Sequence, residues 1–330
     1  MSRSRWACSM TQTSKSSDSK ILCIYMGIPT RTSLKAPVSK LKPPRYWQEH
    51  KLPDTIEYED INYTVEDPVA IIEFNREDRL NAASDKMLAE LRHACAQAEA
   101  DSAVVGIIIT GKGRGFCAGR DIAPGGASGP SKPEGDGSLP VELGDPDVGE
   151  GYARSYAYLA TLRKPVIAAV NGPCVGLGFV LAMMCDMRYI AEDAYFMSAF
   201  GQRGLVAENG IAWMMPRMIG IGRSLEILWS SRKVRGTEAA ELGLAEKCVP
   251  GDQLIDEAKA FIQMLADTVA PSSIHAMKKQ LFRSLELDFG TAFDESRQAL
   301  AEARASGDVT EGMTAFREKR PPNFKRIGAD

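Results

Sequence analysis

The sequence predicts an α/β protein followed by a helical C-terminal part. Two apolar runs, residues 104–110 and 165–170, have the composition of strands buried in a parallel sheet. A stretch with helical spacing of apolar residues precedes the first run and another follows the second, so strands and helices alternate. From residue 237 onward the spacing is helical throughout, and we expect no strands there.

The first elements are expected between residues 56 and 99. Polar and apolar residues alternate on both sides of a turn at Asp67-Pro68, which predicts strands at 56–59, 62–66 and 69–74. Ser84 precedes a stretch whose apolar residues lie three and four apart. Its hydroxyl can cap a helix, so we expect a helix over residues 85–99.

A glycine- and proline-rich segment interrupts the middle of the chain. Residues 124–151 hold eight Gly and five Pro in 28 positions, with six acidic residues and one basic residue. This composition predicts a mobile surface loop without packed elements. Beyond it we expect helices at 178–184, from Ile211 onward, and at 237–242, 252–268, 272–287 and 291–306.

Composition divides the chain into three parts. Residues 1–45 carry nine Lys or Arg and one acid. This composition fits a mitochondrial transit peptide or a disordered tail, and it would also arise if the start codon were assigned too early. We expect a disordered or targeting extension at 1–50, an α/β core at 51–236 and a helical domain at 237–330. The protein is expected to be cytoplasmic, or mitochondrial if residues 1–45 are a transit peptide.

Charge and residue counts exclude several classes of function. The 330 residues include 40 basic and 43 acidic side chains, so no basic excess is present to bind a nucleic acid. Apolar runs stop well short of the ~20 residues that a membrane span needs. Seven cysteines without a C-x-x-C pair, and three histidines without partners at metal spacing, predict neither a metal site nor a disulfide framework.

Two glycine-containing loops follow the two buried strands, at residues 113–121 and 171–178. Glycine lets backbone N–H groups approach a ligand, and the second loop opens a helix whose N-terminus carries partial positive charge. Two converging N–H groups are what acyl chemistry needs to stabilise an enolate or tetrahedral oxyanion. On composition alone both loops can equally be tight turns without a ligand. Neither is a Walker or dinucleotide-binding fingerprint.

Together these segments resemble the crotonase family, which is the enoyl-CoA hydratase/isomerase superfamily. Three family motifs occur in order: N-R through L-N-A at 75–82, F-x-A-G-x-D at 116–121, and K-P-V-I-A-A-V-N-G at 164–172 followed by G-L-G at 176–178, where the family has a glycine triplet. Residues 181–186 continue the last motif, and residues 310–325 resemble the family's C-terminal segment. The resemblance covers residues 55–325, and several independent motifs in the right order make it specific.

The resemblance implies a spiral of ββα units with a C-terminal helical domain that forms a homotrimer or a hexamer. It also implies an acyl-coenzyme A thioester as substrate, with no separate cofactor. The implied oxyanion hole uses the backbone N–H groups of Arg120 and Leu177. Leu177 stands where the family has the middle glycine, which keeps the donor but crowds the hole. The residues expected around the substrate are Ala118, Gly119, Asp121, Gly176, Phe200 and Trp213, although Asp121, like Asp186, matches a family position that serves the structure.

The catalytic acids are where this sequence departs from the family. Typical hydratases carry two glutamates, at positions that align with Val180 and Phe200. Neither apolar side chain can activate water, so the two-glutamate hydration is not expected. A single carboxylate remains at Glu208, where family members that move double bonds often carry one.

Glu208 is therefore the expected catalytic residue. A carboxylate among Phe200, Trp213 and Met214 would have its pKa raised by desolvation, as a general base requires. The alternative is that Glu208 caps the following helix or lies in its first turn.

Three hypotheses follow for the function. The first is an enoyl-CoA double-bond isomerase with Glu208 as proton shuttle, and the second is an enoyl-CoA hydratase that uses Glu208 and an ordered water. The third, of another class, is a non-catalytic acyl-CoA-binding protein. For assembly, residues 254–265 repeat apolar side chains three and four apart, so this helix needs a surface to pack on.

Overall fold

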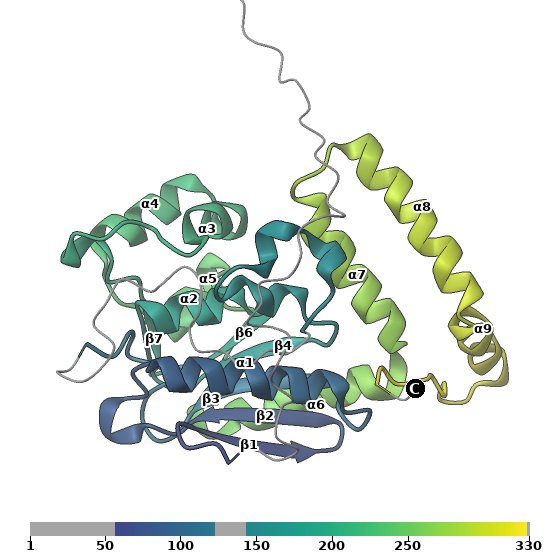
Figure 1. Cartoon of the computed structure of the whole chain (residues 1–330), viewed down its shortest axis with the longest axis horizontal. Coiled ribbons are helices and arrows are strands. Elements are labelled where there is room, and N and C mark those ends of the chain that lie inside the picture. Colours follow the sequence, from purple (N-terminus) through teal and green to yellow (C-terminus); the bar gives the residue numbers. More distant parts are fainter. Residues whose placement is uncertain (1–56, 123–142, 329–330) are drawn as a thin grey trace, which may run out of the picture. The chain divides into compact units, whose positions relative to one another are not determined.

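The computed structural model describes residues 57–122 and 143–328 of the chain, and its fold is α/β with a C-terminal run of helices (Figure 1). The main sheet has six strands in the order β1-β2-β3-β4-β6-β9. The expectations for residues 1–50 and 124–142 lie outside the described residues. The strands of the main sheet are β1 (Ile61–Glu66), β2 (Val69–Phe74), β3 (Gly106–Gly111), β4 (Val166–Val170), β6 (Met187–Ala191) and β9 (Lys247–Val249).

The strands predicted from the longest apolar runs are confirmed. β3 and β4 are buried at every residue and pair in parallel. Only the pairing of β1 with β2 is antiparallel in this sheet. Because β3 and β4 run in the same direction, the two glycine loops that follow them leave the sheet at the same edge.

The prediction of a strand at 56–59 is wrong for residues 57–59, which the structure describes. Residues 57–60 form no strand. The backbone N–H groups of Glu59 and Asp60 instead donate to the Glu90 carboxylate, at 3.1 and 2.8 Å. A side chain of the neighbouring helix thus satisfies the backbone that a strand partner would otherwise bind.

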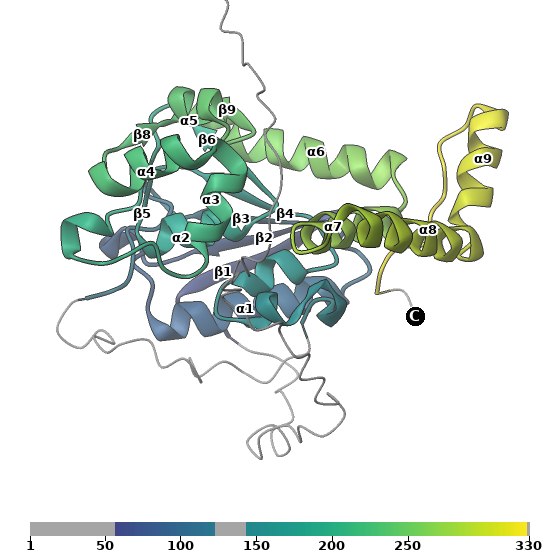
Figure 2. The ribbon, with the colours of Figure 1, turned by 90° about the horizontal axis from the view of Figure 1, so that it is seen from above.

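Helices cover both faces of the main sheet. Figure 2 shows α1 (Asp85–Ala100) and α6 (Leu254–Thr268) on opposite sides of it. The predicted cap of α1 is confirmed, because Ser84 Oγ accepts a hydrogen bond from Met87 N at 2.9 Å. The remaining helices of the core are α2 (Leu177–Met184), α3 (Ile211–Ile219), α4 (Ile221–Ser230) and α5 (Gly236–Leu242).

A second, three-stranded sheet lies beside α2 and was not predicted. It consists of β5 (Pro173–Val175), β7 (Tyr195–Met197) and β8 (Val234–Arg235), in that order. Each strand has only two or three residues, which is too short for an alternating pattern to show in the sequence. This sheet holds the second glycine loop, since β5 is part of that loop.

The expectation that no strand follows residue 237 is wrong. β9 pairs in parallel with β6 at the edge of the main sheet. The predicted apolar face of α6 is confirmed, because Leu254, Ala258 and Ile262 are buried in the same cluster as the sheet. The division of the chain at residue 237 stays a prediction.

Residues 143–151 correct the prediction of an unpacked loop over 124–151. Two short 3₁₀-helices, Pro146–Val148 and Glu150–Ala153, bury Val148 and Tyr152 against Ala160. Asp145 accepts hydrogen bonds from Asp147 N at 2.8 Å and from the ring of His275 at 2.9 Å. Two apolar side chains and one anchoring carboxylate therefore pack this stretch, despite its glycine content.

The last helices are α7 (Pro271–Ser284), α8 (Phe289–Ala305) and α9 (Asp308–Glu318). The first two lie where helices were expected, and α9 falls in the segment recognised only as C-terminal. None of the residues of α8 is buried. Its large apolar side chains are exposed, with Phe289 at 84% of its full accessible area.

Candidate active site

The two glycine loops lie against each other in the structure. Cys117 N donates to Pro173 O at 3.1 Å, and Val175 N donates to Cys117 O at 2.9 Å. A Cβ atom added at Gly119 would lie 3.3 Å from Val175 O and 3.9 Å from Leu177 N. The loop of Arg120 and the loop of Leu177 therefore lie against each other at residues without side chains.

The backbone N–H of Arg120 is directed by a β-bridge to Ala83. Ala83 N donates to Gly119 O at 2.8 Å, and Asp121 N donates to Ala83 O at 3.0 Å. In such a parallel bridge the middle residue turns its own N–H and C=O away from the partner. The Arg120 N–H consequently points away from Ala83, and it has no acceptor within the described part of the chain.

Leu177 is the first residue of α2, so its N–H is free of the helix hydrogen bonds. The first bond of this helix runs from Val180 N to Gly176 O at 3.0 Å. Helix N-termini carry partial positive charge on such N–H groups, which favours an oxyanion. Gly176 has φ of +52°, a conformation that L-residues rarely adopt. The Leu177 side chain is buried in the core.

Two asparagine side chains shape the first loop: Asn81 is buried and Asn171 is half-buried. Asn81 Nδ2 donates to Gly115 O at 2.7 Å, and Asn171 Nδ2 donates to Gly111 O at 2.7 Å and Gly113 O at 2.9 Å. Both asparagines belong to the motifs that carried the resemblance, but no role was predicted for them. Their amides replace the strand partners that residues 111–115 lack after leaving β3.

The ion pair of Arg76 with Asp121, at the end of the first loop, was also not predicted from the sequence. Arg76 Nη2 donates to the Asp121 carboxylate at 2.8 Å, and Asp121 is buried. Asp121 was expected near the substrate, but its carboxylate binds a side chain of the protein. Ala118 is fixed as well, because its N–H donates to Leu80 O at 3.0 Å.

Val180 and Phe200, which align with the hydratase glutamates, are both buried. Val180 lies in α2, and Phe200 follows β7 at 3% exposure. Both belong to the main apolar cluster. The positions that supply acids in typical hydratases are therefore dry and apolar in this chain.

The side chain of Glu208 is exposed. The expectation that Phe200, Trp213 and Met214 shield its carboxylate from water is therefore wrong. Trp213 packs instead against Tyr152, with the ring centroids 6.1 Å apart. The loop of Glu208 stands out from the core because residues 201–206 before it are exposed too.

Glu208 also does not cap the following helix. The N-cap of α3 is Gly210, and its first turn contains no acid. Among the described residues the Glu208 side chain has no hydrogen-bond or ion-pair partner. Its carboxylate is thus free to meet a substrate.

Asp186 has the structural role that its family position suggested. Its carboxylate accepts from Val166 N and from Lys278 Nζ, both at 2.7 Å. Burial raises the pKa of Asp186, and the Lys278 ammonium acts in the opposite direction. This pair joins the start of β4 to α7.

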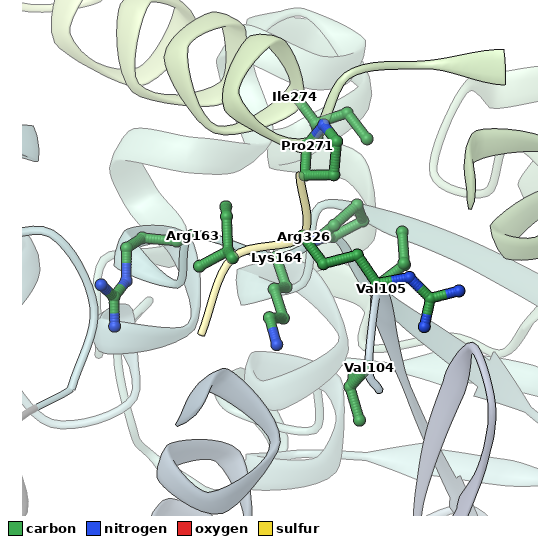
Figure 3. Close-up of a pocket in the computed structure, with 9 residues that line it drawn as sticks. Val104, Val105, Arg163, Lys164, Pro271, Ile274 and Arg326 are labelled. Atoms are coloured by element: carbon green, nitrogen blue, oxygen red, sulfur yellow. The ribbon is translucent and has the colours of Figure 1, made fainter. Parts of the chain in front are cut away.

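Two cavities among the described residues do not offer an alternative catalytic site. The small pocket of Figure 3, about 10 Å³, has room for one water at most. Beside it Lys164 Nζ donates to Ala98 O at 2.9 Å and Asp101 O at 2.6 Å, and burial lowers the pKa of Lys164 to about 8. A groove of about 890 Å³ between α7 and α8 is lined by charged side chains that mostly bind one another.

Residues 57–122 and 143–328 contain neither a cluster of metal ligands nor a helix that could span a membrane. No three His, Cys, Asp or Glu side chains gather there as ligands of a metal ion would. No helix in these ranges has both the length and the apolar character needed to cross a bilayer.

The family model described as Enoyl-CoA hydratase/isomerase matches residues 64–327. The chain belongs to this family. It is an enzyme of the crotonase superfamily, as its motifs implied.

Curated and solved relatives share this family. The chain is 34% identical over 265 residues to a 1,2-epoxyphenylacetyl-CoA isomerase of Escherichia coli, covering 79% of this chain and 96% of the relative. It is 32% identical over 273 residues to a probable enoyl-CoA hydratase of Rhodobacter capsulatus, covering 81% and 98%. The crystal structure of an enoyl-CoA hydratase from Bacillus anthracis has a TM-score of 0.70 and 28% identity, covering 81% and 99%. Relatives of this enoyl-CoA hydratase/isomerase family member thus include both isomerases and hydratases.

Proposed function

We propose that this enzyme moves a double bond in an enoyl-CoA thioester, with Glu208 as the only carboxylate that shuttles a proton. The observation that carries the proposal is the contrast between the acid positions. Val180 and Phe200 are apolar and buried, whereas Glu208 is exposed and has no partner among the described residues. Hydration by two acids needs a carboxylate at both of the positions that Val180 and Phe200 occupy here, whereas isomerisation needs one base.

The proposed reaction is a simple sequence of proton movements. The thioester oxygen accepts hydrogen bonds from the N–H groups of Arg120 and Leu177. Glu208 removes a proton from the carbon between the carbonyl and the double bond, and the electron pair moves into the carbonyl to give a dienolate. The same carboxylate returns the proton to the far carbon of the former double bond, so the net reaction neither adds nor removes an atom.

The relatives support an acyl-CoA thioester as the substrate. Those compared above are named as an isomerase of an acyl-CoA epoxide and as enoyl-CoA hydratases. All of these names contain coenzyme A. In our proposal coenzyme A enters only as part of the substrate, and the protein uses no separate cofactor.

An enoyl-CoA hydratase remains the second candidate. Its support is the exposure of Glu208, which leaves room for an ordered water beside the carboxylate. Several relatives are also named as hydratases.

Labelled water distinguishes the two candidates. We expect 3-hexenoyl-CoA to be converted to 2-hexenoyl-CoA in H₂¹⁸O without uptake of ¹⁸O. Mass spectrometry of the thioesters after incubation with either isomer measures this directly. Formation of ¹⁸O-labelled 3-hydroxyhexanoyl-CoA at a rate above that of isomerisation would establish the hydratase instead.

We also propose that the enzyme is a homotrimer, or a hexamer of two trimers, built through α7–α9. Within each helix the exposed apolar residues recur three, four or seven apart, so each set shares one face. A helix such as α8, with no buried residue, gains too little from its own hydrogen bonds to be stable alone. These residues are Met277 and Leu281 in α7 with Leu285 as its C-cap, Phe289, Phe293 and Leu300 in α8, and Val309, Met313 and Phe316 in α9.

Light scattering on the full-length enzyme tests this assembly. We expect the wild type to have the mass of three or six chains, and the double variant Phe289→Asp with Phe293→Asp to be monomeric because buried charges oppose association. Trp229→Asp is the matched control, since Trp229 is exposed on α4, away from these helices. A monomeric wild type with full activity would refute the proposal.

A further inference from the structure

Arg76 binds three segments that converge behind the first glycine loop. Its guanidinium donates to the Asp121 carboxylate at 2.8 Å and to Ala82 O, and it lies 3.5 Å from the Asp60 carboxylate. The side chains of Arg76 and Asp121 are 20% and 9% exposed. Charge-assisted hydrogen bonds in such partly buried positions are stronger and less screened than those between surface groups.

The partners of Arg76 lie on both sides of the bridge that directs the Arg120 N–H. Ala82 precedes Ala83, which forms one side of this bridge, and Asp121 follows Arg120 on the other. One guanidinium therefore holds both strands of the bridge at adjacent residues. If it is removed, the two short backbone bonds of Ala83 must fix the loop alone.

We propose that Arg76 is a positioning residue, which aims the Arg120 N–H into the oxyanion hole through Asp121 and Ala82. This inference rests on the oxyanion hole of the proposed function. Arg76 does not touch the substrate. Its effect is to keep the donor aligned with the thioester oxygen.

Alignment of this donor matters most when charge develops on the thioester oxygen. Loss of a whole oxyanion donor typically lowers kcat by about 10²–10³. Misalignment of a donor that is still present should cost less, about 10-fold to 100-fold. Binding of the coenzyme A part should change little, because the Arg76 contacts are all within the protein.

The decisive probe is butanoyl-CoA labelled with ¹³C at its thioester carbonyl. This saturated thioester has no double bond to move, so it reports on the hole without turnover. Hydrogen bonds to the carbonyl oxygen polarise it and move the ¹³C resonance downfield. We expect this shift with the wild type and with Glu208→Gln, and a clearly smaller shift with Arg76→Met at saturating probe.

Matched variants separate positioning from loss of structure. Arg79→Met is the control, because Arg79 is exposed and, within the described part of the chain, its one ion pair is with exposed Asp78 at 3.5 Å. Arg76→Lys should recover part of the shift, since lysine keeps the charge but not the planar fork. Asp121→Asn should resemble Arg76→Met, and the double variant should lose little more than either, because both changes break one interaction.

The outcomes distinguish this inference from the proposed function. A kcat for 3-hexenoyl-CoA that falls about 10-fold to 100-fold in Arg76→Met, with KM nearly unchanged and a reduced ¹³C shift, supports positioning. A wild type without any ¹³C shift would refute the oxyanion hole itself. If the wild type gave a normal ¹³C shift and folded Arg76→Met gave the same shift, the positioning role of Arg76 would be refuted and the oxyanion hole would stand. Additive losses of the ¹³C shift in the double variant of Arg76 and Asp121 would also refute that role.

Discussion

Glu208→Gln is expected to lower kcat for double-bond isomerisation by about 10²–10⁴, the usual contribution of a general base. Glutamine keeps the size and polarity of the side chain but cannot accept the proton from the substrate. Because Glu208 has no partner among the described residues and lies on an exposed loop, we expect the free energy of unfolding to change by less than about 0.5 kcal/mol.

Steady-state kinetics with 3-hexenoyl-CoA and a denaturation curve measure both effects. Glu192→Gln is the matched control, since Glu192 is an exposed glutamate in the turn between β6 and β7. It should leave kcat unchanged. If Glu208→Gln kept the wild-type rate, the proton would have to move through another group, and the proposed role would be wrong.

Gly178→Ala is expected to destabilise the fold and disrupt the oxyanion hole together. A Cβ atom at this position would lie 2.2 Å from Cys117 O, a backbone atom that no rotamer change can move aside. The strain must push the start of α2 away from the first loop. We expect a loss of about 1–3 kcal/mol in stability, as overpacking typically costs. The separated donors should lower kcat/KM by about 10²–10³.

Gly222→Ala provides the control for this substitution. Gly222 also lies in a helix, but no atom is found within 4 Å of its Cβ position. Alanine there should raise stability by about 0.4–1 kcal/mol, because it restricts the unfolded chain. Chemical denaturation measures the stability of the two variants, and steady-state kinetics measures their kcat/KM. Equal stability of both variants would show that α2 can shift without cost.

Sequence patterns predicted the elements whose burial is uniform along their length. β3 and β4 are apolar at nearly every residue, and the apolar spacing of α1 and α6 matches one buried face each. The strands of the small sheet and β9 were missed because two or three residues show no period.

The candidate site was predicted in its order along the chain but not in its supporting contacts. Arg76 and Asp121 lie 45 residues apart in different motifs, so nothing local indicated that they pair. The exposure of Glu208 could not be predicted either, because burial of a loop depends on which elements fold over it. The resemblance implied the two backbone donors, and the structure shows that their loops touch.

The ion pair of Asp186 and Lys278 has a consequence for exchanging parts between relatives. Asp186 Oδ2 binds the first residue of β4, and β4 leads directly into the loop of Leu177. Lys278 comes from α7, in the C-terminal helices. A hybrid enzyme that received these helices from a relative without the lysine would keep a half-buried carboxylate that has lost its cation, and removing one partner of a buried pair costs up to about 3–5 kcal/mol. The C-terminal helices are therefore not an interchangeable attachment, because the strand that leads to the proposed active site depends on a cation that they supply.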